Sequence, residues 1–104
     1  MSSIPAFVSE LVRAANEVDR LTMREIEHLL FRAIRTIRDL RDMIGIPVNG
    51  TEHDTIIRLG GLAATAGQAT PAEVREGLLR AADMVRTLWI VIDSGTEITL
   101  KPSR

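Results

Sequence analysis

The chain of 104 residues contains no cysteine and no tyrosine, and its only aromatic side chains are Phe7, Phe31 and Trp89. Without cysteine, disulfides, thiolate nucleophiles and cysteine-based zinc or iron–sulfur sites are excluded. With so few aromatic residues, the core must be built from Leu, Ile, Val and Ala. Such a core suits helix-on-helix packing better than a β-sandwich, which favours aromatic and β-branched strands.

The chain also has almost no net charge: it contains 13 basic and 14 acidic residues, which gives a net charge of −1. No overall field therefore draws the chain to nucleic acid or to anionic lipid. The longest strongly apolar run, residues 88–92, is far shorter than the ~20 residues that a membrane span needs. The first ten residues lack the basic start and long apolar stretch of a secretory signal. We expect a cytoplasmic protein, and the predominance of Arg, with Lys101 the single lysine, fits a GC-rich bacterial genome.

What the chain does have is two heptad repeats, each with apolar residues at alternating spacings of three and four. This spacing places the side chains on one stripe of an α-helix, which requires another helix to pack on. The first repeat consists of Met23, Ile26, Leu30, Ala33, Ile37, Leu40 and Ile44. The second consists of Val74, Leu78, Ala81, Val85, Leu88 and Ile92.

The ends of the helices carry clear signals. Thr22 and Glu25 predict a capping box at the start of the long helix, and Gly45 stands where a left-handed residue would end it. Thr70 and Glu73 repeat the capping box before the last helix. Two further helices are predicted over residues 3–20 and 51–67. In the second of these, residues 60–67 are nearly all small, which indicates either close approach of a neighbouring helix or a helix end running into a loop.

The C-terminal region allows two interpretations. Residues 88–92 are all apolar, and residues 93–95 have the composition of a turn. In residues 96–101, polar and apolar side chains alternate as they would in a strand. Either the last helix ends at Ile92 and an extended tail follows, or a short β-hairpin turns at residues 93–95. The unbroken heptad favours the helix. We therefore predict a single all-α domain over residues 1–104, an antiparallel three- to four-helix bundle ending in a tail or a hairpin.

His28 is the residue that most invites a chemical role. Its heptad position faces solvent, an arrangement that resembles histidine phosphotransfer domains, and Arg32 lies one turn further on. The residues that follow His28 do not match the small or Lys-Gly pattern of those domains. Glu25 and His28 also share the spacing of di-iron bundle ligands, but both face outward, where they cannot form such a site. We expect no enzyme, no metal and no cofactor, with phosphotransfer through His28 and Arg32 as the alternative function.

The long helix also carries an Arg-rich face, interleaved with acidic residues. The pairs Arg35–Asp39 and Arg38–Asp42 are one turn apart and are expected to neutralise each other. No motif for DNA or RNA recognition accompanies this face. Nucleic-acid binding is therefore the second alternative, and a solvated, ion-paired surface is favoured over it.

Two pairs of large apolar residues lie off the heptad stripes: Phe31 with Ile34, and Trp89 with Ile90. Apolar groups outside the intramolecular core often mark contacts with another subunit or partner, although other helices of the same chain can also cover them. The leading hypothesis is a small non-enzymatic helical interaction protein, a regulator or adaptor that acts through an apolar helix face. The apolar surplus further predicts a homodimer.

Overall fold

The computed structural model describes the backbone of residues 3–45 and 50–100, and the side chains of residues 3–45 and 53–93. Within these residues the chain is all-α, with no strand, which confirms the predicted fold class. A short 3₁₀ turn, η1, joins the first two helices. The elements in chain order are α1 (Ile4–Asn16), η1 (Val18–Arg20), α2 (Met23–Ile44), α3 (Gly50–Ala64) and α4 (Pro71–Leu100).

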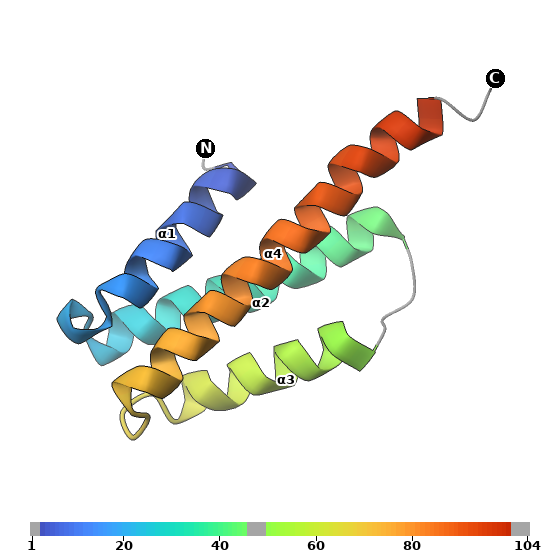
Figure 1. The fold of residues 1–104 in the computed structure, drawn as a ribbon. Coiled ribbons are helices and arrows are strands. Elements are labelled where there is room, and N and C mark those ends of the chain that lie inside the picture. Colours follow the sequence, from blue (N-terminus) through green and yellow to red (C-terminus); the bar gives the residue numbers. More distant parts are fainter. Residues whose placement is uncertain (1–2, 46–49, 101–104) are drawn as a thin grey trace.

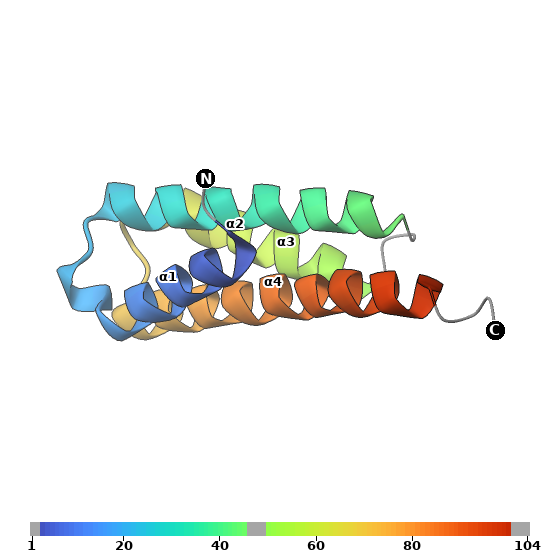
Figure 2. The same ribbon diagram turned by 90° about the horizontal axis from the view of Figure 1, so that it is seen from above.

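The bundle is built around α2 and α4, which lie side by side and run in the same direction (Figure 1). Helices α1 and α3 run the opposite way and flank this central pair on its two sides (Figures 1 and 2). The closely packed helix pairs are α1–α4, α2–α4, α2–α3 and α3–α4. Helix α1 is thus antiparallel to α2, as the short connection predicts, but it packs chiefly on α4. The result is an elongated body of 54 × 25 × 21 Å.

The helix ends that carry capping signals form as the sequence indicates, whereas α1 ends at Asn16 and not at residue 20, and α3 ends at Ala64 and not at residue 67. In the capping box of α2, the backbone N–H of Thr22 donates to Glu25 Oε1 at 2.8 Å, and the N–H of Glu25 donates to Thr22 Oγ1 at 3.1 Å. Thr70 and Glu73 make the same two bonds at the start of α4, with the same lengths. Gly45 closes α2 in the left-handed conformation, with φ of 75°, which glycine adopts without steric cost.

Both heptad stripes lie in the core. Met23 is the exception, because it projects from the first turn of α2 and is half exposed. The buried members are Ile26, Leu30, Ala33, Ile37 and Leu40 from α2, and Val74, Leu78, Ala81, Val85 and Leu88 from α4.

The small residues 60–67 span the end of α3, which stops at Ala64, and the turn that follows it. This agrees with the expected helix end running into a loop. Close approach occurs at one point, since a Cβ on Gly67 would lie 2.7 Å from Met23 Sδ. A Cβ on Gly61 would meet nothing within 4 Å. The second close approach is on α4, where Gly77 lies against the side chain of Leu62.

Of the two interpretations of the C-terminal region, the favoured helix is confirmed and the alternative hairpin is wrong, but the helix does not stop at Ile92. Helix α4 continues through residues 93–95 to Leu100, so any extended tail is confined to residues 101–104, outside the described residues. The physical reason is that a helix satisfies its own backbone hydrogen bonds. An isolated two-stranded hairpin is marginal in water unless another element covers it.

Candidate interaction surfaces

The outer face of α2 presents an aromatic side chain to solvent. Leu30 is 0% exposed and its neighbour Phe31 is 57% exposed, because successive helical residues point about 100° apart. Ile34 lies one turn beyond Phe31 and packs partly into the core, with its Cδ1 4.0 Å from the position of a Cβ on Gly60 of α3. The structure therefore separates this predicted pair: Phe31 faces outward, and Ile34 packs against the bundle.

Three arginines border Phe31 on the same face of α2. Arg24 and Arg38 lie seven residues before and after Phe31, and Arg35 lies four residues after it, spacings that share one side of a helix. All three are exposed. In residues 3–45 the expected pairs with Asp39 and Asp42 are not formed, and the only ion pair there involves Arg32. An exposed ring is therefore flanked by three guanidinium groups that form no ion pair with another described residue.

The second predicted pair, Trp89 and Ile90, is divided in the same way. Trp89 is partly buried and packs against the core, whereas Ile90 is 53% exposed. Both residues lie in the half of α4 that extends past the N-terminal end of α1 (Figure 2). This part of α4 thus offers Ile90, and beside it the half-exposed Val91, to solvent.

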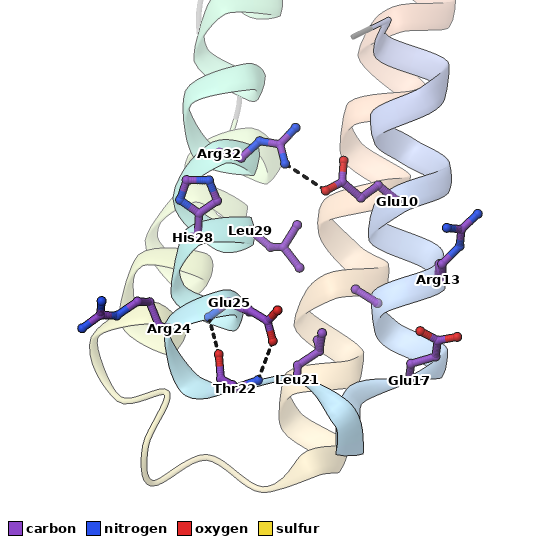
Figure 3. A pocket seen from close by; sticks show the side chains of 11 residues that line it. Glu10, Arg13, Glu17, Leu21, Thr22, Arg24, Glu25, His28, Leu29 and Arg32 are labelled. Atoms are coloured by element: carbon purple, nitrogen blue, oxygen red, sulfur yellow. Dashed lines mark hydrogen bonds and ion pairs between the residues drawn. The ribbon is translucent and has the colours of Figure 1, made fainter.

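A groove of about 610 Å³ lies between α1 and α2, next to the segment that connects them (Figure 3). Its floor is apolar, and its rim carries charges of both signs. Ala14, Leu21 and Leu29 contribute the apolar part; the charged and polar part comes from Glu10, Arg13, Glu17, Thr22, Arg24, Glu25, His28 and Arg32. In Figure 3, Arg13 and Arg24 point away from each other on opposite sides of the groove.

Arg32 closes one end of this groove and contacts α1 in two ways. Its Nη1 donates to Glu10 Oε2 at 2.9 Å, and its guanidinium carbon lies 4.4 Å from the centroid of the Phe7 ring. Both partners belong to α1, so Arg32 ties α2 to α1. His28 is exposed on the outer rim and has no hydrogen bond or ion pair with any described residue. The two residues of the phosphotransfer alternative line the same groove, but Arg32 is directed to α1 and not to His28.

Other exposed apolar side chains, which were not predicted from the sequence, include Met43, Ile57 and Leu79. A signal for two of them was present. Ile57 follows Ile56, and Leu79 follows Leu78, just as Phe31 follows Leu30. Neighbouring residues diverge by about 100° around the helix, so one member of such a doublet can be left facing solvent, although Leu29 and Leu30 are both buried. Leu79 joins Val8 and Val12 of α1 along a smaller groove of about 170 Å³ between α1 and α4.

Within the described residues, no three His, Asp or Glu side chains gather closely enough to hold a metal ion. No helix in that part of the chain combines the length and apolar character needed to cross a lipid bilayer. Comparison with known proteins finds no match: no family model, curated protein or solved structure is significantly similar to the chain. The candidate sites therefore rest on the surfaces described above.

Proposed function

We propose that this protein is a non-enzymatic helical interaction protein, a regulator or adaptor that binds a partner protein through the outer face of α2. The observation that carries the proposal is the 57% exposed ring of Phe31 between Arg24, Arg35 and Arg38, three exposed arginines that form no ion pair with another described residue. Phenylalanine and arginine are among the residues that are enriched at protein–protein interfaces relative to the rest of the surface.

The chemistry of this surface also specifies its partner. A ring flanked by cations one and two turns away fits an amphipathic helix with an apolar centre and acidic residues on either side. Each arginine can form two parallel hydrogen bonds with a carboxylate. The partner we expect is therefore an acidic, amphipathic helix of another protein. The predicted homodimer would use a surface on α4.

The test is capture of partners from the lysate of the native host, comparing the wild type with Phe31→Ser. The matched control is Met43→Ser, because Met43 is 66% exposed on the same helix but lies about 120° around it from Phe31. We expect a specific partner to be lost with Phe31→Ser, retained with Met43→Ser, and weakened by salt. A partner retained equally by both variants would contradict the proposal.

The same surface gives a clear contrast with nucleic-acid binding. Binding of DNA or RNA through Arg35 and Arg38 would depend on phosphate contacts and fall steeply with salt. It would survive Phe31→Ser largely unchanged if the ring does not stack on bases. We expect no shift of a random-sequence oligonucleotide by the wild-type protein at physiological salt, and a clear shift would favour the alternative.

A further inference from the structure

Helix α4 carries a stripe of the kind that we expect the α2 surface to bind. Ile90 is 53% exposed and lies in the half of α4 that extends past α1, which therefore does not cover it (Figure 2). Asp83 precedes Ile90 by seven residues, and Glu97 follows it by seven. Seven residues are close to two helical turns, so the three positions lie on one line along α4. We call Asp83, Ile90 and Glu97 the acidic stripe.

The α2 surface has the opposite charges at the same spacing. Arg24 and Arg38 lie seven residues before and seven residues after Phe31, and both are exposed. When Phe31 is set against Ile90 of a second copy, the two arginines come level with the two acidic positions of the stripe. This match of an apolar centre and the charges on either side of it identifies the occupant as a second copy of the chain.

We propose that the α2 surface of one copy binds the acidic stripe of a second copy, with the two helices parallel. The remaining charges select this direction. In the parallel arrangement Arg86 is level with Glu27, and Asp93 is one position away from Arg35. In the antiparallel arrangement Arg86 is level with Arg35, and like charges that face each other across a helix pair are destabilising. The inference rests on the proposed function, because it uses the same α2 surface.

The contact that Asp83 already makes is compatible with this pairing. Its Oδ1 lies 3.7 Å from Nη2 of Arg86, and a carboxylate can accept from more than one donor. The side chains of Asp83 and Arg86 are 73% and 64% exposed, and exposed ion pairs contribute little to stability. Asp83 can therefore turn to Arg24 of a second copy at little cost.

The contact joins different faces of the two copies. Phe31 projects from α2 and Ile90 from α4, and both point away from the core that these helices share. A two-fold pair would need both surfaces on one face, so the copies associate head to tail and further copies can add. One pair of helices gives a contact smaller than a standard protein interface, so the assembly should dissociate on dilution. Self-association also competes with a partner helix, because both occupy the α2 surface.

Two complementary variants test the head-to-tail contact. Light scattering on a sizing column should show the wild-type mass rising with concentration past twice the monomer mass of 11.5 kDa. Phe31→Ser lacks the centre of the α2 surface and Ile90→Ser lacks that of the acidic stripe, so each alone should be monomeric. Their equimolar mixture should form a dimer and grow no further, because one intact surface remains on each variant. The control is Ile57→Ser, which removes a 59% exposed side chain of α3 and should associate as the wild type does.

Three outcomes would overturn the proposal: a wild type that is monomeric at every concentration, a single variant that still associates, or a mixture that stays monomeric. Ile90→Ser keeps the α2 surface and should still capture the partner from the lysate. Failure of the proposed function and failure of this inference are therefore distinguishable. Circular dichroism of each variant checks that the helices are retained.

A charge exchange tests the parallel alignment. Arg24→Asp sets an acid against Asp83 of the next copy and should raise the concentration needed for association. Adding Asp83→Arg to the same chain should lower that concentration again, because residues 24 and 83 then carry opposite charges once more. In the antiparallel arrangement residue 24 is level with residue 97, so the second substitution would not restore association. A double variant that associates no better than Arg24→Asp would overturn the parallel arrangement.

Discussion

At the scale of single residues, the direction in which a side chain leaves its helix decides its role. Leu30 and Phe31 are neighbours of similar hydrophobicity, yet one is completely buried and the other is mostly exposed. Leu30 therefore contributes to stability, and Phe31 is available for binding. Arg32, the next residue, is neither free nor buried, because it is held between the Glu10 carboxylate and the Phe7 ring.

Truncation of these neighbours should have opposite consequences. Leu30→Ala should lower the free energy of unfolding by about 2–5 kcal/mol, because it leaves a cavity in the core. Phe31→Ala should change it by less than about 1 kcal/mol, because the ring buries little of its surface in the folded chain. Urea denaturation at one fixed protein concentration measures both. Equal losses would show that Phe31 belongs to the core.

Two glycines give a second contrast at this scale. Gly61 is a helical residue of α3 with open space around it, so Gly61→Ala should raise stability by about 0.5–1 kcal/mol. Gly45 has φ of 75°, so Gly45→Ala should lower stability by about 1–2 kcal/mol. Thermal unfolding of the two variants should therefore shift in opposite directions. A destabilised Gly61→Ala would reveal a neighbour that α3 needs at that position.

At the scale of elements, each of the two long helices begins with the same reciprocal pair of hydrogen bonds. The capping boxes of α2 and α4 satisfy backbone N–H groups that have no partner inside the helix. They also fix the residue at which each of these helices begins. Local chemistry at four residues thus sets the start of both central helices.

Removing either threonine should weaken the fold by about 1 kcal/mol, since this is the usual contribution of an N-cap hydroxyl. We expect Thr22→Ala and Thr70→Ala to show similar losses, and the double variant their sum, because the two caps share no hydrogen-bonding partner. Thr87→Ala, at an exposed position inside α4, is the control and should be neutral or slightly stabilising. If Thr22→Ala and Thr70→Ala lowered the free energy of unfolding no more than Thr87→Ala does, the capping hydrogen bonds would not contribute to stability.

At the scale of the whole molecule, α2 and α4 form the centre and α1 and α3 are flanking helices (Figure 1). Helix α4 contacts all three others, so unfolding it leaves only the contact between α2 and α3 among the closely packed helix pairs. A flanking helix can open while the central pair persists, because it gives up only its own contacts. The free energy of local unfolding should consequently be highest in α2 and α4 and lower in α1 and α3.

Amide hydrogen exchange should follow this gradient. We expect the slowest exchange around Ile37 in α2 and Val85 in α4, both completely buried, and faster exchange throughout α1 and α3. The measurement is mass spectrometry of peptides from each helix at one protein concentration. Uniform protection across all four helices would show that the bundle opens only as a unit.

The amino-acid sequence by itself determined the type of each element and most of its ends. Helical periodicity and helix capping involve residues that are only three to seven positions apart. They can therefore be recognised in the sequence without knowing which helices pack together. The same reading placed Phe31 and Ile90 outside the heptad stripes, where both are half or more exposed. These conclusions needed no knowledge of the fold.

The tertiary structure decided which helices meet and where each side chain goes between them. Ile34 and Trp89 turned inward because α3 and the core of the bundle lie beside them. Arg32 pairs with Glu10, 22 positions earlier in the chain. The central place of α4, and its continuation as a helix to Leu100, likewise depended on the whole arrangement. The physical reason is that packing and ion pairing join residues far apart in sequence, which local patterns do not encode.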